Sequence, residues 1–158
     1  MQIRHKNREI YFREQTECTQ KYVIPYIEQV LCIKSNLRVL EIGCGEGGNL
    51  KPFLDVGCHC VGIDIDVAQL EKAKAFFANH SLNKNLRLIA NDIYKVSPNE
   101  IGNFDLIILR DVIEHLPNQE LFMHQLKCFM HSESVVFFGF PVWCNPFGGH
   151  QQICRNKW

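Results

Sequence analysis

The segment from Glu41 to Asn49, with the sequence EIGCGEGGN, constrains the fold of this chain more than any other feature. Four of the six residues from Gly43 to Gly48 are glycine. Glycines permit positive φ angles and leave no Cβ to keep a ligand away from the backbone. The preceding run Arg38–Ile42 is typical of a strand, and the residues from Gly48 to Val56 predict a helix. A glycine-rich loop between strand and helix is the ligand-binding turn of open parallel α/β sheets.

The rest of the chain continues this alternation of strand and helix signals. Asp66 and Asn118 stand where N-caps belong, so each predicts the start of a helix. The alternation predicts a parallel sheet with helices on both faces. The predicted strands are Arg38–Ile42, Cys58–Ile63, Asn85–Ala90, Phe104–Leu109 and Ser134–Phe140.

Composition limits the classes of protein that this chain can belong to. Its 158 residues suit one domain, and 46% hydrophobic residues exclude a disordered chain. The 17 basic and 17 acidic residues leave no net charge, so we expect no nucleic-acid partner. No apolar run reaches the roughly 18–20 residues of a membrane span, and the charged N-terminus does not suggest a signal peptide.

The eight cysteines are scattered and form no CxxC pair, which favours a reduced, cytoplasmic protein without a disulfide framework. Cys58, His59 and Cys60 could suggest a metal site. Neighbouring strand residues point to opposite faces, however, and no second ligand pair stands at zinc spacing. We therefore expect no metal.

The glycine loop alone leaves two cofactors open. Gly43, Gly45 and Gly48 satisfy the G-x-G-x-x-G pattern, and Asp64 follows 21 residues after the first glycine. That combination fits an NAD(P)-dependent oxidoreductase, in which the acid binds a ribose hydroxyl. Three further features favour another interpretation: an acid at Glu41, an Asn91-Asp92 pair after the third strand, and the run from Phe104 that ends in Glu114-His115-Leu116.

With these motifs, residues 37–141 closely resemble the class I S-adenosylmethionine-dependent methyltransferases. The family's E/D-x-G-x-G-x-G motif is matched by Glu41, Gly43, Gly45 and Gly47. The resemblance implies a three-layer, Rossmann-like α/β sheet, mainly parallel, with strand order 3-2-1-4-5. It implies S-adenosylmethionine as cofactor and S-adenosylhomocysteine as product, and the E-H-L motif is typical of members that act on small molecules.

The resemblance also assigns roles to single residues. Asp64 is expected to bind the ribose hydroxyls, and Asp92 with Ile93 to contact the adenine. The alternatives without a cofactor are that Asp64 only begins a turn before the next helix and that Asp92 is an ordinary acidic loop residue. Asp66 is interpreted as a helix cap. The full set of expected cofactor-binding residues is Glu41, Gly43, Cys44, Gly45, Asp64, Ile65, Asp92, Ile93 and Arg110.

Methyl transfer needs a general base only where the acceptor must lose a proton. Arg110, Asp111, His115 and His150 are the candidates near the expected methyl position. His115 and His150 are predicted as the catalytic pair, although His115 could be a packing residue and His150 part of a mobile tail. Aromatic residues of the N-terminal helices, such as Tyr11, could cap the cofactor, but we favour a core role for them.

Three regions are expected: an N-terminal helical cap at 1–36, a cofactor-binding core at 37–141, and a tail at 142–158 that lines the acceptor pocket. The family fold has seven strands, whereas this chain has sequence for five. We therefore expect a C-terminally truncated chain or an open sheet edge covered by a homodimer or another partner. The alternatives to a small-molecule methyltransferase are the NAD(P)-dependent oxidoreductase and a non-catalytic module that binds S-adenosylmethionine or serves assembly.

Overall fold

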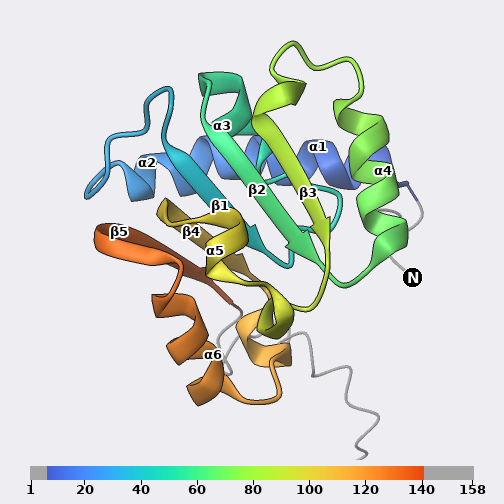
Figure 1. The fold of residues 1–158 in the computed structure, drawn as a ribbon. Coiled ribbons are helices and arrows are strands. Elements are labelled where there is room, and N and C mark those ends of the chain that lie inside the picture. Colours follow the sequence, from blue (N-terminus) through green and yellow to red (C-terminus); the bar gives the residue numbers. More distant parts are fainter. Residues whose placement is uncertain (1–6, 141–158) are drawn as a thin grey trace, which may run out of the picture.

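The computed structural model describes residues 7–140 (Figure 1). The strands are β1 (Arg38–Ile42), β2 (His59–Asp64), β3 (Leu86–Ala90), β4 (Phe104–Arg110) and β5 (Met130–Gly139). The helices are α1 (Arg8–Cys18), α2 (Ile24–Ile27), α3 (Lys51–Val56), α4 (Val67–Phe77), α5 (Pro98–Ile101) and α6 (Gln119–Lys127). Short π or 3₁₀ segments are η2 (Thr19–Val23), η3 (Asn83–Asn85), η4 (Ile93–Lys95) and η5 (Ile113–His115).

The five strands form one parallel sheet in the order β3-β2-β1-β4-β5. This confirms the predicted Rossmann-like α/β class and the strand order 3-2-1-4-5. The chain moves outward from β1 to β3 and then crosses back to add β4 on the other side of β1. The strand order thus reverses between β1 and β4, which is where ligands bind in open α/β sheets.

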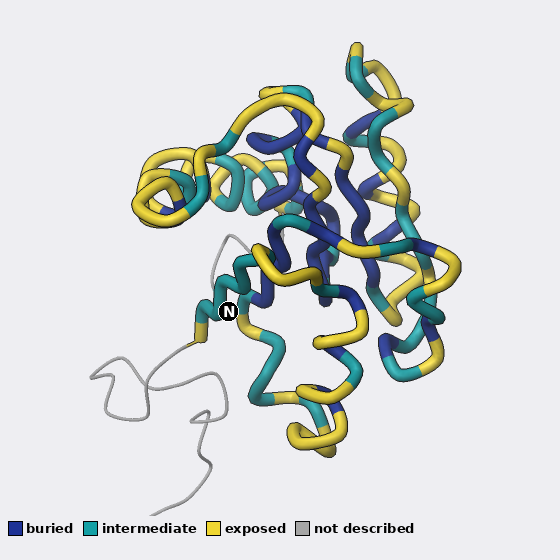
Figure 2. The backbone as a smooth tube through the Cα atoms, turned by 60° about the vertical axis from the view of Figure 1, so that its left-hand side comes forward, coloured by how far each residue is buried: buried dark blue, intermediate teal, exposed yellow. Residues whose placement is uncertain are grey.

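Two hydrophobic cores fill the space on the two faces of the sheet, because successive strand residues point to opposite sides. Val39 and Leu106 pack on the face covered by α1, η2, α2, α3 and α4. Leu40 and Ile107 pack on the face covered by α5 and α6. Figure 2 shows the resulting distribution, with the buried segments concentrated in the sheet and the exposed ones on the helices and loops.

Two element boundaries differ from the sequence prediction. The helix predicted from Gly48 begins at Lys51, because the residues before it remain in the glycine turn. The last strand begins at Met130 rather than Ser134, with an irregularity opposite the start of β4. There the Ser134 hydroxyl donates to the Phe104 carbonyl at 2.6 Å and accepts from the His131 amide at 2.8 Å, which holds the bulge.

The N-terminal helical region packs against the glycine loop and α4. The Phe12 ring stacks on Phe76, with centroids 4.5 Å apart, and meets Phe77 edge-on at 5.6 Å. The Thr19 hydroxyl donates to Asn49 Oδ1 at 2.8 Å. The predicted tail at 142–158, with His150, lies outside the described residues. Within residues 7–140, no helix is long and apolar enough to cross a membrane.

Candidate functional site

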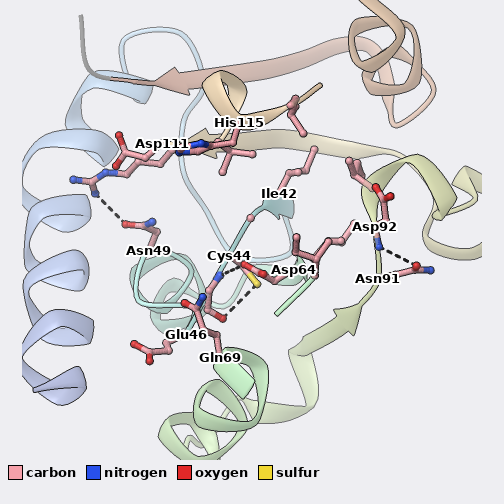
Figure 3. Close-up of a pocket in the computed structure, with 18 of the residues that line it drawn as sticks. Ile42, Cys44, Glu46, Asn49, Asp64, Gln69, Asn91, Asp92, Asp111 and His115 are labelled. Atoms are coloured by element: carbon pink, nitrogen blue, oxygen red, sulfur yellow. Dashed lines mark hydrogen bonds between the residues drawn. The ribbon is translucent and has the colours of Figure 1, made fainter. Parts of the chain in front are cut away.

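A cavity of about 490 Å³ lies at the carboxyl-terminal edge of the sheet (Figure 3). Its wall is built from the glycine loop, the ends of β2, β3 and β4, and one face of α1. The residues that line it are Tyr11, Gln15, Ile42, Gly43, Cys44, Gly45, Glu46, Asn49, Ile63, Asp64, Ile65, Gln69, Asn91, Asp92, Ile93, Tyr94, Arg110, Asp111, Val112, His115, Leu116 and Pro117.

The glycine loop has the backbone geometry that its sequence predicts. Gly43, Gly45 and Gly47 have φ angles of 71°, 52° and 78°, whereas Gly48 is not in the positive-φ region. Positive φ is costly for residues with a Cβ, so these three positions explain the glycines. They coincide with the E-x-G-x-G-x-G pattern rather than with the third glycine of G-x-G-x-x-G. The loop therefore favours the methyltransferase interpretation.

Asp64, at the end of β2, both shapes the turn and faces the cavity. Its Oδ2 accepts from the Gly45 amide at 2.7 Å, and its Oδ1 accepts from the Asp66 amide at 2.8 Å. A carboxylate oxygen can accept more than one hydrogen bond, so both oxygens retain capacity toward the cavity. Asp66 caps α4 by accepting from the amides of Ala68 and Gln69, which confirms its predicted role.

The end of β3 supplies a second polar group and an apolar surface. The Asp92 carboxylate accepts from the Tyr94 amide at 3.0 Å, and Asn91 Oδ1 accepts from the Asp92 amide at 2.9 Å. Ile93 is buried, whereas the side chain of Ile65 is left largely exposed at 75%. Both isoleucines line the cavity.

Arg110, at the end of β4, turns toward the N-terminal helices. Its guanidinium donates to Asn49 Oδ1 at 3.0 Å and contacts Cys18 Sγ at 3.2 Å. Asn49 in turn donates to Glu41 Oε1 at 2.7 Å. Glu41 is fully buried beneath the loop and is absent from the cavity wall, and burial raises the pKa of its carboxyl group to about 8.

The segment after β4 places two further predicted candidates on the wall. Asp111 has a φ of 55°, uncommon for a residue with a Cβ, and its amide donates to the Gly139 carbonyl at 2.7 Å. His115 lies on the wall with about half of its side chain exposed, and its Nε2 is 3.9 Å from a Glu114 carboxylate oxygen. Figure 3 shows Asp111 and Asp92 on opposite sides of the site, with Asp64 between them.

Sequence reasoning favoured a core role for the aromatic residues of α1 and kept a place beside the cofactor only as the alternative. Tyr11 and Gln15, four residues apart on one helical face, both line the cavity, whereas Tyr11 was expected in the core. The ion pair from Arg8 Nε to Glu46 Oε1, at 2.6 Å, fastens α1 to the glycine loop. Burial raises the pKa of the Tyr11 phenol, and the nearby Asp111 charge adds to this shift. The i, i+4 spacing indicated a shared face but not which surface that face meets.

The described part of the chain holds no cluster of three or more histidine, cysteine or acidic side chains arranged for a metal ion. Cys58 and Cys60 are buried in the hydrophobic core, and desolvation raises the pKa of both thiols. They behave as small apolar residues there.

Comparison with known proteins agrees with this fold. Residues 12–142 match the sequence profile of a family described as "Methyltransferase domain". This chain belongs to that family, the class I S-adenosylmethionine-dependent methyltransferases. It is 26% identical over 125 residues to ubiquinone biosynthesis O-methyltransferase of Bartonella tribocorum, covering 72% of this chain and 49% of that protein. The same figures hold for its counterpart in Brucella melitensis. The chain thus spans about half the length of these curated relatives.

Solved structures share the fold at lower identity. Coclaurine N-methyltransferase bound to N-methylheliamine and SAH matches with a TM-score of 0.65 and 20% identity, over 76% of this chain and 35% of that one. PKMT2 from Rickettsia typhi in complex with AdoHcy matches with a TM-score of 0.64 and 23% identity, over 75% and 24% of the two chains.

Proposed function

We propose that this domain binds S-adenosylmethionine in the cavity at the sheet edge and directs its methyl group to a small-molecule acceptor. The observation that carries the proposal is the combination, on one cavity wall, of the glycine turn and the Asp64 carboxylate. The turn has positive φ at Gly43, Gly45 and Gly47, and Asp64 accepts from the Gly45 amide. The cavity volume lies within the roughly 300–1,000 Å³ range of cofactor sites.

The donor and acceptor groups on the wall fit the parts of this cofactor. Asp64 can accept from both ribose hydroxyls with its remaining lone pairs. Asp92 can accept from the adenine amino group, while Ile65 and Ile93 can cover the faces of the base. Arg110 can pair with the carboxylate of the amino-acid part, and the backbone of the glycine loop can approach it because no Cβ intervenes. Cys44 belongs to the glycine loop and lines the cavity. Glu41 is buried beneath the loop and would influence the cofactor only through Asn49.

When bound, S-adenosylmethionine supplies a methyl group on a sulfonium that is already a good leaving group. This chain contributes position and enclosure: α1 and the glycine loop hold one side of the cavity, and the segment after β4 holds the other. Fixing the acceptor in line with the methyl group lowers the entropic part of the barrier, and excluding water removes a competing nucleophile.

His115 is the proposed general base for an acceptor that arrives with a proton, because its side chain lies on the cavity wall and a neutral imidazole nitrogen can accept a proton. The likeness to ubiquinone biosynthesis O-methyltransferases supports a small-molecule acceptor. His150, the second predicted catalytic residue, remains a prediction. Six cysteines of the described part are free thiols, which supports the proposed cytoplasmic location.

Calorimetric titration with S-adenosylhomocysteine, and separately with NADH, tests the proposal. We expect micromolar binding of the former and none of the latter. Asp64→Ala should abolish binding, whereas Asp66→Ala, which removes the neighbouring cap outside the cavity, should preserve it. Binding of NADH alone, or binding of S-adenosylhomocysteine that survives in the folded Asp64 variant, would contradict the assignment.

A further inference from the structure

We propose that Asn49 positions the Arg110 guanidinium on the cavity wall, so that this cation can pair with the carboxylate of the cofactor's amino-acid part. This inference rests on the proposed function, which assigns that pairing to Arg110. It adds a residue outside the expected cofactor-binding set, and it gives that residue a role through Arg110 rather than through direct contact with the cofactor.

Asn49 lies at a point where three parts of the chain meet. It is buried, with 3% of the residue exposed, and it borders the cavity at the end of the glycine loop (Figure 3). Its amide nitrogen donates to Glu41 Oε1 of β1 at 2.7 Å. Its amide oxygen accepts from the Thr19 hydroxyl of η2 at 2.8 Å and from Arg110 Nη1 of β4 at 3.0 Å. One side chain thus links the N-terminal helices, the centre of the sheet and the end of β4.

These contacts fix the orientation of the Asn49 amide. A guanidinium has only donors, so it can bond to the oxygen of an amide but not to the nitrogen. Turning the amide over would bring its NH₂ group against the guanidinium and remove the hydrogen bond from Arg110. The hydroxyl of Thr19, a residue with 1% exposure, holds the same oxygen. Because a buried polar group without a partner is costly, Asn49 presents Arg110 with an acceptor in a fixed place.

The sheet register places Arg110 beside the glycine loop. Ile42 of β1 pairs with Leu109 of β4, and each is followed by a residue on the cavity wall, Gly43 and Arg110 respectively. The proposed binding mode sets the ribose against Asp64 and the amino-acid part against the glycine loop. Arg110 therefore stands at the end of the cavity where the cofactor would carry its carboxylate.

The hydrogen bond to Asn49 leaves part of the guanidinium available to a ligand, because an arginine side chain carries five N–H groups. Besides its bond to Asn49, Nη1 lies 3.5 Å from the Thr19 hydroxyl, and Nη2 lies 3.2 Å from Cys18 Sγ. Within residues 7–140, Arg110 forms no ion pair with an acidic side chain. Its charge can therefore pair with a ligand carboxylate, and holding the planar group in one direction beforehand favours that pairing.

A double-mutant cycle measures whether Asn49 acts through Arg110. Calorimetry gives the affinity for S-adenosylhomocysteine of the wild-type chain, Asn49→Ala, Arg110→Met and the double variant. We expect about tenfold weaker binding for Arg110→Met and about fivefold weaker binding for Asn49→Ala. Adding Asn49→Ala to Arg110→Met should cause no further loss, because Asn49 then has no guanidinium to position. The ligand 5′-methylthioadenosine lacks the amino-acid group and should bind all of these proteins equally.

Asn103→Ala is the matched control, because the Asn103 amide donates to the Met130 carbonyl at 2.8 Å and lies outside the cavity. It should change neither affinity. If Asn49→Ala does not fold, Thr19→Val takes its place in the cycle, since it removes only a hydroxyl that holds the same amide oxygen. For Thr19→Val we expect about twofold weaker binding of S-adenosylhomocysteine, and no further loss when it is added to Arg110→Met.

Several results would overturn the inference. Unchanged binding of S-adenosylhomocysteine by Arg110→Met would mean that the guanidinium does not meet the cofactor, and unchanged binding by Asn49→Ala would mean that Arg110 needs no support. Equal losses from Asn49→Ala with and without the guanidinium would mean that Asn49 acts independently of it. Weaker binding of 5′-methylthioadenosine by Asn49→Ala would mean that the substitution disturbs the whole cavity. In all these cases the wild-type chain still binds S-adenosylhomocysteine, whereas its failure to bind would refute the proposed function itself.

Discussion

Glu41 makes the stability of this domain depend on pH in a predictable direction. Burial raises the pKa of its carboxyl group to about 8 in the folded chain, against an ordinary value of 4.5. Between these values the folded state holds a proton that the unfolded state has released. The free energy of unfolding must therefore fall as pH rises through this window, and linkage gives a loss of about 2 kcal/mol between pH 6 and pH 8.

Urea unfolding of the wild-type chain and of Glu41→Gln at pH 6, 7 and 8 measures this effect. The glutamine keeps an oxygen for the Asn49 amide and carries no charge, so its buried side chain does not titrate. All other ionisable groups are the same in both proteins, so their contributions cancel in the comparison. Relative to the wild type, the variant should gain about 2 kcal/mol from pH 6 to pH 8. A constant difference between the two proteins would refute the reasoning, because it would mean that Glu41 has the same protonation in both states.

Two further predictions concern the glycine loop and its contact with α1. Gly47→Ala should cost about 2–4 kcal/mol of stability, because φ is 78° and the new Cβ would lie 2.9 Å from a buried phenylalanine ring. Gly57→Ala is the control and should cost less, because the nearest neighbour of its new Cβ would be 3.3 Å away. Urea unfolding measures both costs, and a larger cost for Gly57→Ala would contradict this reasoning. Arg8→Leu should cost about 2 kcal/mol, because it removes the closest ion-pair partner of the buried Glu46 carboxylate. Arg13→Leu removes an exposed ion pair and should cost less than about 1 kcal/mol. Thermal unfolding compares the two variants, and equal losses in melting temperature would show that the Arg8–Glu46 ion pair does not hold α1 to the glycine loop.

The sheet and the centre of the site could be predicted because their signals are local. The β4 sequence FDLIILR is a continuous apolar run, as expected for a strand buried on both faces, and the glycines at 43, 45 and 47 report backbone angles directly. Asp64 follows from its place at a strand end. All of these features depend on residues that are close in sequence. The order of the motifs along the chain is what made the family resemblance recognisable.

The remaining parts depend on tertiary contacts that no local pattern encodes. Tyr11 and Gln15 reach the cavity because Phe12 and Thr19, their neighbours on the N-terminal helices, dock on α4 and on Asn49. The early start of β5 depends on a bulge held by the Ser134 hydroxyl. The left-handed turn at Asp111, after β4, could not be predicted either, because residues with a Cβ rarely adopt positive φ.

The most direct test of the central claim, that a cofactor binds at the carboxyl-terminal edge of the sheet, is an amide spectrum of the ¹⁵N-labelled chain titrated with S-adenosylhomocysteine. Gly43 and Gly45 line the cavity, whereas Gly57 and Gly102 precede strands and lie at the opposite edge. We predict that the amide signals of Gly43 and Gly45 shift and that those of Gly57 and Gly102 stay in place. Shifts confined to Gly57 and Gly102, or a spectrum of folded protein that does not change, would contradict the account.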